Sequence, residues 1–326
     1  MIKVEHLKKY YGDFLAVNDL SFEIGEGAVY GFLGPNGAGK STTMNIITGC
    51  LSPTEGKVTV SGYDILEEPI RAKRMIGYLP EHPPLYQQET PVEYLRFVGQ
   101  AKGLRGEKLE KAIESVIELT GIQSVSGRLI SALSKGYQQR VGIAQALLGD
   151  PEVIILDEPT VGLDPIQIIE IRDLIKKLGE NHTVIFSSHI LSEVQTICEK
   201  VLIIAKGELI AFDTPENLEK IEQEKCAVHL TVLGGPEETV QALSEFFGEE
   251  SGRYSIDDSA SEEPSDTTKV RIQTDGGDTK ALCRDLFFHF AAKNLALTEM
   301  TTERASLEKI FVELTEQSAE REVGKK

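Results

Sequence analysis

Short runs of apolar residues alternate with stretches of helical periodicity through the first two thirds of the chain. The clearest runs are Val29–Leu33, Val153–Leu156 and Thr183–Ser187, and each has the length and composition of a strand buried on both faces. Strands that alternate with helices are typical of a mainly parallel sheet, because parallel neighbours need a crossover connection. This pattern predicts an α/β core.

The segment from Pro91 to Gly149 follows a different pattern. Leu109, Ile113 and Val116 repeat at the three- and four-residue spacing of a helix, and no run typical of a strand interrupts the segment. We therefore predict a helical insertion at about residues 85–150 of the α/β core.

The last third of the chain is predicted to form a second domain. The strand Val201–Ala205 is followed by a short polar helix, Pro215–Lys220, and the junction there separates residues 1–220 from residues 221–326. Beyond it, the patterns follow the order βαββαβ plus a helix, which is that of a small ferredoxin-like α+β module. The acidic, serine-rich stretch 255–266 lacks a hydrophobic repeat and is expected to be a loop. The predicted elements are strand 226–233, helix 236–247, strand 252–257, strand 269–274, helix 279–292, strand 294–300 and helix 305–317.

Charge and composition narrow the class of function. The chain carries 34 basic and 52 acidic residues, a net charge of −18. Proteins that bind DNA or RNA need basic surfaces to neutralise phosphates, so this balance argues against a nucleic-acid partner. The four cysteines form no CxxC pair, which favours reduced, cytosolic thiols over a zinc site or disulfide framework. We expect neither a membrane span nor a signal peptide, so work at a membrane would require a partner.

A phosphate-binding loop follows the first apolar strand. The sequence matches G-x-x-x-x-G-K-[ST] at every defined position, between the strand and a helical pattern over Ser41–Thr48. Glycines allow backbone N–H groups to approach the phosphates, while Lys40 would reach the β- and γ-phosphates and Ser41 would ligate Mg²⁺. The predicted nucleotide-binding residues here are Gly34, Pro35, Asn36, Gly37, Ala38, Gly39, Lys40, Ser41 and Thr42.

Two further strands end in residues suited to catalysis. Val153–Leu156 leads into Asp157 and Glu158, at the sheet edge where ligands of α/β proteins bind. Asp157 is suited to hold Mg²⁺ or one of its waters, and Glu158 to orient and deprotonate an attacking water. The strand Thr183–Ser187 leads to His189, which could hydrogen-bond a γ-phosphate or the water-activating carboxylate. Alone, a histidine at a strand end is more often structural.

A resemblance emerges when one more segment is added. Leu133–Arg140 precedes a helical pattern for which Ser134 is a natural N-cap. The order of the phosphate loop, this segment, the paired carboxylates, Gly162–Asp164 and His189 resembles the nucleotide-binding subunits of ATP-binding cassette (ABC) transporters. The resemblance covers about residues 1–220, and five ordered motifs are far more specific than any one of them.

The resemblance implies a fold, ligands and partners. The fold is an α/β P-loop ABC ATPase domain, with a mainly parallel sheet, an antiparallel β subdomain and the helical insertion. The ligands are ATP and Mg²⁺, and two copies form a head-to-tail dimer in which Ser134 and Gly136 of one copy face the γ-phosphate held by the other. Tyr11 lies where the family places the aromatic ring that stacks on adenine; Tyr10 as the stacking ring, with Tyr11 in the core, is the alternative.

Two positions of the signature segment depart from the family's commonest Leu-Ser-Gly-Gly-Gln. Lys135 replaces its first glycine and Tyr137 its glutamine, whereas Ser134 and Gly136 remain. We expect the contact to the phosphate to survive.

Glu81 is a third departure, because the family usually has glutamine at this position. Its oxygen can still bind Mg²⁺, together with Ser41 and Asp157. Its charge would add a third acid beside Asp157 and Glu158, which is expected to change the metal affinity and the pH dependence of hydrolysis.

These variants resemble two-component export systems. They imply an ATP-hydrolysing subunit that energises a separate polytopic membrane permease for export and stays cytoplasmic, at the inner face of the cell membrane. The alternative is a soluble ABC-type ATPase that acts as a mechanical clamp on a ribosome or DNA. Such relatives usually carry two cassettes in one chain or a long inserted coiled coil, and neither pattern occurs in this sequence.

Overall fold

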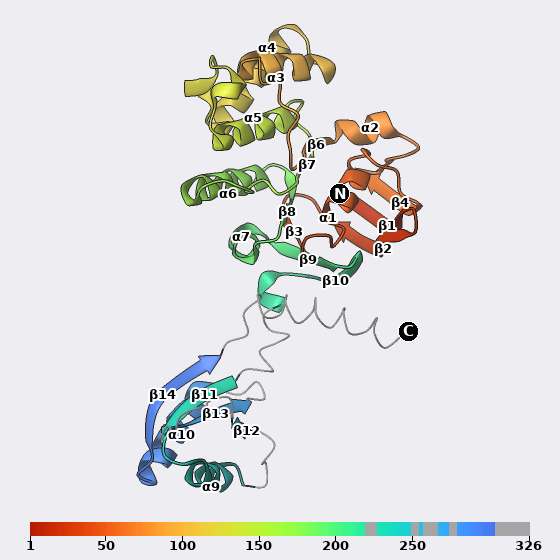
Figure 1. Cartoon of the computed structure of the whole chain (residues 1–326). Coiled ribbons are helices and arrows are strands. Elements are labelled where there is room, and N and C mark those ends of the chain that lie inside the picture. Colours follow the sequence, from red (N-terminus) through yellow and green to blue (C-terminus); the bar gives the residue numbers. More distant parts are fainter. Residues whose placement is uncertain (219–226, 249–253, 257–266, 274–278, 304–326) are drawn as a thin grey trace. The chain divides into compact units, whose positions relative to one another are not determined.

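The computed structural model describes residues 1–218, 227–248, 254–256, 267–273 and 279–303 (Figure 1). The predicted helix 305–317 and residues 257–266 of the predicted acidic loop lie outside this range. The chain divides into two compact units, one that contains Met1–Pro215 and one that begins at Glu216.

A six-stranded sheet forms the centre of the larger unit, in the order β10-β9-β3-β8-β7-β6. All neighbouring pairs are parallel except β10 with β9 at one edge. The predicted mainly parallel sheet is therefore confirmed, and β3, β7 and β8 are buried along their whole length, as continuous apolar runs require. The strands are β3 (Val29–Leu33), β6 (Ile76–Leu79), β7 (Val153–Leu156), β8 (Thr183–Ser188), β9 (Lys200–Ala205) and β10 (Glu208–Asp213).

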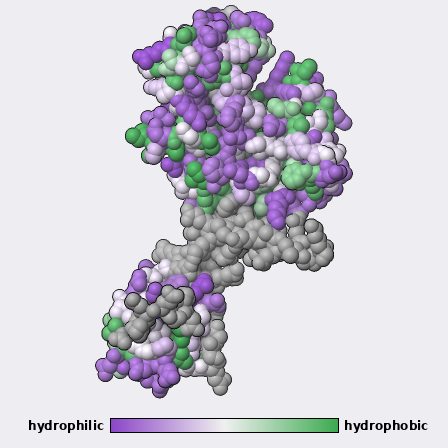
Figure 2. All heavy atoms as spheres, in the orientation of Figure 1, coloured by the Kyte–Doolittle hydropathy of each residue, from purple (hydrophilic) through white to green (hydrophobic). Residues whose placement is uncertain are grey.

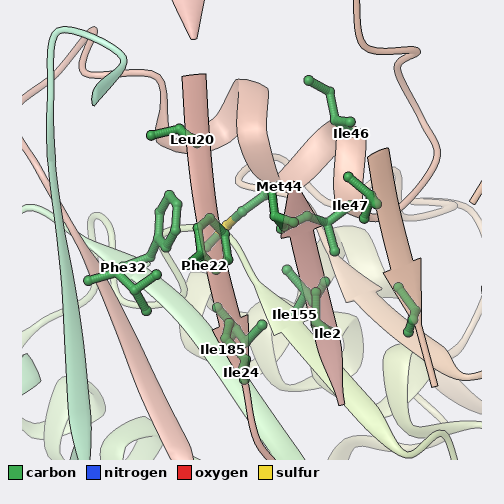
Figure 3. Close-up of a cluster of buried hydrophobic side chains, with 14 of the residues drawn as sticks. Ile2, Leu20, Phe22, Ile24, Phe32, Met44, Ile46, Ile47, Ile155 and Ile185 are labelled. Atoms are coloured by element: carbon green, nitrogen blue, oxygen red, sulfur yellow. The ribbon is translucent and has the colours of Figure 1, made fainter. Parts of the chain in front are cut away.

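A second, four-stranded antiparallel sheet lies beside it, in the order β2-β1-β4-β5. Helix α1 (Lys40–Ile47) packs into the core that the two sheets share. Figure 3 shows Met44 of α1 pointing towards Phe22 of β2, and Phe22 in turn packs against Phe32 of β3, with ring centroids 6.0 Å apart. These apolar contacts fix α1 directly behind the phosphate loop. The strands are β1 (Ile2–Tyr11), β2 (Phe14–Ile24), β4 (Glu55–Val60) and β5 (Tyr63–Asp64).

The regular elements of the predicted insertion are all helical. In Figure 1 its α-helices lie together, apart from the antiparallel strands β1, β2 and β4. The Lys102 ammonium closes this group by donating to the carbonyls of Gln145, Ala146 and Leu148 at the end of α5, and burial lowers the pKa of Lys102 to about 8. The elements are α3 (Pro91–Ala101), α4 (Gly106–Thr120), the 3-10 turns Gln123–Val125 and Ile130–Ala132, and α5 (Lys135–Leu147).

In the described part of this unit, three more helices are α2 (Pro69–Arg74), α6 (Pro165–Gly179) and α7 (Leu191–Ile197). On the face shown in Figure 2, the hydrophobic residues form separate patches among hydrophilic ones, which fits a unit that keeps most of its apolar side chains inside.

The described residues of the second unit follow the predicted βαββαβ order, with antiparallel strand pairs and the sheet order β12-β13-β11-β14. Both helices coincide with their predicted ranges. The last strand begins later than predicted, because Asn294 takes a left-handed backbone conformation (φ 59°) and residues 293–295 form the turn that ends α10. The elements are β11 (Ala227–Leu233), α9 (Pro236–Phe247), β12 (Tyr254–Ile256), β13 (Thr267–Gln273), α10 (Thr279–Ala292) and β14 (Ala296–Glu303).

Candidate nucleotide-binding site

Four neighbouring parallel strands end in residues that the sequence singles out. Along the order β3-β8-β7-β6, β3 is followed by Gly34, β8 by His189, β7 by Asp157 and Glu158, and β6 by Glu81 two residues later. Since parallel strands present their carboxyl ends at one edge of a sheet, the fold brings these separate motifs together.

The phosphate loop turns tightly between β3 and α1. Gly37 and Gly39 have φ values of 82° and 101°, and a Cβ on Gly39 would lie 2.6 Å from the Ala16 carbonyl oxygen. Only glycine fits there. Helix α1 begins at Lys40 without a capping side chain, so its amino-terminal N–H groups present partial positive charge to the space above the loop.

The Glu158 carboxylate lies between the Lys40 ammonium and the His189 imidazole. One carboxylate oxygen, Oε1, is 3.5 Å from the Lys40 ammonium, and the other, Oε2, is 2.9 Å from Nδ1 of His189. Lys40 and Glu158 are only 6% and 7% exposed, and Lys40 also donates to the Gly34 carbonyl at 2.8 Å. Of the two contacts proposed for His189, the structure contains the one to the carboxylate.

The backbone of Glu158 is strained. Its φ of 47° lies in the left-handed region, which costs a non-glycine residue about 1–2 kcal/mol. The Glu158 N–H donates to Ser187 Oγ at 2.7 Å, and that hydroxyl donates to Asp157 Oδ1 at 2.6 Å. A conformation of this cost persists only where its surroundings hold it, so the carboxylate is oriented by the network around it.

Oxygen atoms suited to Mg²⁺ gather next to the phosphate loop. Ser41 Oγ lies 3.2 Å from Asp157 Oδ1, and Glu81 lines the same cavity. Burial of the Tyr78 phenol raises its pKa well above the usual range, and the charges of Asp157 and Glu81 add to this shift. Among the described residues, no three His, Cys, Asp or Glu side chains form a metal cluster by themselves. This donor set fits Mg²⁺, which commonly takes one or two carboxylates plus the oxygens of a bound phosphate.

A cavity of about 510 Å³ opens over the loop. Gly34, Pro35 and Asp157 do not line it but contact residues that do. The lining residues are Tyr11, Phe14, Ala16, Asn36, Gly37, Ala38, Gly39, Lys40, Ser41, Thr42, Glu81, Glu158, Val161 and His189.

The aromatic part of the cavity is larger than the sequence predicts. Tyr11 lines the cavity and is 49% exposed, so the alternative with Tyr11 in the core is wrong; Tyr10 does not line it. Phe14, which was not predicted, lies directly opposite Tyr11 across the β1–β2 hairpin and is 65% exposed. The register of the β1–β2 hairpin could have identified Phe14, because it pairs this residue with Tyr11.

Ser134 and Gly136 do not line the cavity over the phosphate loop. They line a separate hollow of about 200 Å³ with residues of α5 and α6. Ser134 is the N-cap of α5, and its hydroxyl accepts from the Tyr137 N–H at 3.4 Å. Gly136 is covered by Gln167, whose Cδ would be 2.6 Å from a Cβ at this position. The two sets of predicted phosphate contacts are thus not brought together within one chain.

Helix α5 is tied to its neighbours on both sides. Arg140 donates to the Thr120 carbonyl of α4 at 2.8 Å and to the Glu170 carboxylate of α6 at 2.7 Å. The Lys135 ammonium lies against Gly162, in the space that a Cβ on that glycine would fill. The unusual Lys135 therefore links the start of α5 to the turn after β7.

The fold and this site define a P-loop nucleoside triphosphatase. A family model described as ABC transporter matches residues 17–161. The linearmycin resistance ATP-binding protein LnrL of Bacillus subtilis is 33% identical over 316 residues, which cover 97% of this chain and 98% of that protein. The bacitracin transport ATP-binding protein BcrA of Bacillus licheniformis is 41% identical over 212 residues, 64% of this chain and 68% of that protein. The chain belongs to the family of ABC transporter ATP-binding proteins.

A solved structure supports the same conclusion. The dimeric, post-hydrolysis ATP-binding cassette MJ0796, bound to ADP and Pi, superposes with a TM-score of 0.60 at 28% identity, over 66% of this chain and 98% of that one. The chain is thus an ATP-binding and ATP-hydrolysing subunit of an ABC transporter, as its motifs predict. Within the part of the chain that the structure describes, none of the helices is both long and apolar enough to cross a bilayer.

Proposed function

We propose that the chain works as a head-to-tail homodimer in which each ATP is held between two copies. The observation that carries this proposal is the separation of the two half-sites. The phosphate loop and Glu158 line one cavity, whereas Ser134 and Gly136 line another. A hydroxyl and a helix amino terminus form a second anion site, which a second copy would bring to the γ-phosphate. ATP binding would then close the dimer, and hydrolysis would open it.

Each composite site would use its residues in the following way. Glu158 orients the attacking water and accepts its proton, while His189 holds the Glu158 carboxylate in place. Lys40 and the amino terminus of α1 neutralise phosphate charge. Ser41, Asp157 and Glu81 would hold Mg²⁺, which supplies further charge neutralisation when bound.

We further propose that the dimer energises a separate polytopic permease for export, and that this partner holds it in the cytoplasm at the inner face of the membrane. The relatives named for bacitracin transport and linearmycin resistance support this direction. The helical insertion offers a docking surface, because Tyr86 and Phe97 are half-exposed and in contact, with ring centroids 5.2 Å apart. Residues 1–220 would form the ATPase domain and residues 221–326 an accessory domain.

Purification from detergent-solubilised membranes tests this partner. A tagged chain is expected to retain one multi-span membrane protein, and the variant Phe97→Glu is expected to lose it. Glu67→Gln, an exposed change outside the insertion, serves as the control. Association with ribosomes or DNA alone would favour the mechanical clamp instead.

Glu81→Gln tests the metal site. We expect this variant to keep substantial ATPase activity, but to need about three- to tenfold more Mg²⁺ for half-maximal rate, because one negative charge leaves the site. The measurement is a Mg²⁺ titration at constant ATP, with Glu67→Gln as the control. Identical titration curves would remove Glu81 from the metal site.

Phe14→Ala tests the aromatic half of the cavity. Stacking of a base on an aromatic side chain contributes about 1–3 kcal/mol, so both Phe14→Ala and Tyr11→Ala are expected to weaken ATP binding by about 5- to 100-fold. Binding of inorganic tripolyphosphate, which has no base, should stay unchanged. Equal losses for both ligands would mean that the rings support the phosphate loop rather than the base.

A further inference from the structure

A buried carboxylate behind the site bridges the two segments that carry the proposed catalytic residues. Glu193 lies on α7, is 2% exposed, and its Oε2 accepts hydrogen bonds from Thr160 Oγ1 at 2.9 Å and from Ser188 Oγ at 2.8 Å. Thr160 comes two residues after Glu158, and Ser188 comes immediately before His189. One oxygen atom therefore joins both flanks of the Glu158–His189 pair.

Burying the Glu193 carboxylate in this way costs folding free energy. The other oxygen, Oε1 of Glu193, is the buried side-chain polar atom that lacks a hydrogen-bond partner among the described residues. Buried polar atoms are nearly always paired, and leaving one unpaired destabilises the folded state. An apolar side chain would have no unpaired oxygen, but it would deprive the buried hydroxyls of Thr160 and Ser188 of this acceptor. The glutamate is therefore accounted for by the two hydroxyls that it holds.

The two residues whose hydroxyls bind Glu193 each make a hydrogen bond to the backbone of the residues that follow. Thr160 opens the turn after β7, since its carbonyl accepts from the Leu163 N–H at 3.2 Å. Ser188 Oγ accepts from the Ile190 N–H at 2.9 Å, which spans His189. A shift of the turn at residues 161–164 would therefore be transmitted to the backbone of His189 through the Glu193 carboxylate.

The link through Glu193 matters because the backbone of Glu158 is strained and must be held on both sides. The left-handed backbone conformation of Glu158 is held on one side by Ser187. On the other side the chain passes through Pro159 to Thr160, whose hydroxyl is anchored on Glu193. Without that anchor, the strained residue could relax towards an ordinary conformation and move its carboxylate away from His189.

We propose that Glu193 is a positioning residue that couples the turn at residues 161–164 to His189 and keeps Glu158 in its hydrolytic orientation. This inference rests on the proposed function, because it assumes that Glu158 and His189 act in hydrolysis. It assigns Glu193 to the chemical step and not to ATP binding, since the carboxylate does not line the nucleotide cavity.

The test compares variants of the full chain by kcat, KM and ATP affinity. Because a misplacement of about 1 Å can cost about 100-fold in rate, Glu193→Leu is expected to lower kcat by about that factor with ATP affinity unchanged. Glu193→Gln keeps an oxygen that can accept from both hydroxyls, so we expect it to recover kcat to within about fivefold of the original chain. A wild-type kcat in Glu193→Leu, or equal losses in the two variants, would overturn the proposal.

Two milder variants keep the proposal testable if Glu193→Leu does not fold. Thr160→Val and Ser188→Ala each remove one hydroxyl and are expected to lower kcat by about tenfold. If Glu193→Leu does not fold, an unchanged kcat in both single variants overturns the proposal. If it folds, neither change should lower kcat further when combined with Glu193→Leu, because the shared acceptor is already gone. Losses that multiply would show that the hydroxyls act independently of Glu193.

A trapping experiment separates positioning from general damage. In a Glu158→Gln background, Glu193→Leu is expected to form an ATP-bound dimer as readily as Glu158→Gln alone, and loss of that dimer would show that Glu193 supports binding instead. If Glu158→Gln itself hydrolyses ATP at the original rate, the assignment of the base fails. If only the results expected for the Glu193 variants are not observed, the proposal for Glu193 fails, but the assignment of Glu158 as the base stands.

Discussion

Replacing Glu158 by glutamine is expected to lower ATP turnover by about 100- to 10,000-fold, the usual contribution of a positioned general base. Glutamine keeps the shape of the side chain but cannot accept the proton of the attacking water. ATP binding should remain intact, because Lys40 and the phosphate loop are unchanged. Closed, nucleotide-bound dimers should therefore accumulate, since the step that opens them is blocked.

Steady-state phosphate release and size-exclusion chromatography with and without ATP measure the two effects of Glu158→Gln. Glu152→Gln is the matched control, because Glu152 is an exposed glutamate that directly precedes β7, at the end of the strand away from Glu158. Turnover near the original value in Glu158→Gln would refute the assignment of the base.

The second large effect is expected at Lys40. Its ammonium is buried and donates to the Gly34 carbonyl, 3.5 Å from Glu158. In Lys40→Ala a bound triphosphate would lose this cation while the negative charge of Glu158 remains beside it. Because charge-assisted hydrogen bonds contribute about 1.5–3 kcal/mol each, we expect ATP affinity to fall by about 100-fold or more.

Equilibrium titration with ATP measures the affinity, and a thermal melt confirms that Lys40→Ala is folded. Lys177→Ala removes an exposed lysine near the end of α6 and serves as the control. An affinity within about threefold of the original would mean that Lys40 contributes little to phosphate binding, contrary to its expected role in a P-loop.

Much of this architecture follows from local patterns. The strands β3, β7 and β8 are mostly apolar runs; β3 leads directly into the glycine-rich loop, and β7 and β8 end at polar or charged residues. Both the strands and the convergence of their motifs could therefore be predicted. Helices α9 and α10 were also predicted to the residue, because turn residues and apolar periodicity agree there. The shifted start of β14 shows the limit, since it depends on the left-handed turn at Asn294.

The contacts inside the site could not be predicted in the same way. Phe14 joins the cavity only through the register of the β1–β2 hairpin. Glu193 looks like one acidic residue on an amphipathic helix, and its partners Thr160 and Ser188 come from two other segments. Such contacts depend on how the elements pack in three dimensions, and sequence periodicity carries no information about that packing.

Subunit mixing tests most directly the claim that each active site is shared by two copies. Lys40→Ala disables the phosphate loop, and Ser134→Asp keeps a good N-cap but places a negative charge against the partner's γ-phosphate. Each variant alone is expected to be inactive. In mixed dimers, one site combines both changes and the other is intact. Random mixing should therefore restore up to about a quarter of the original ATPase activity, whereas activity that stays at the level of the two separate variants would contradict a shared site.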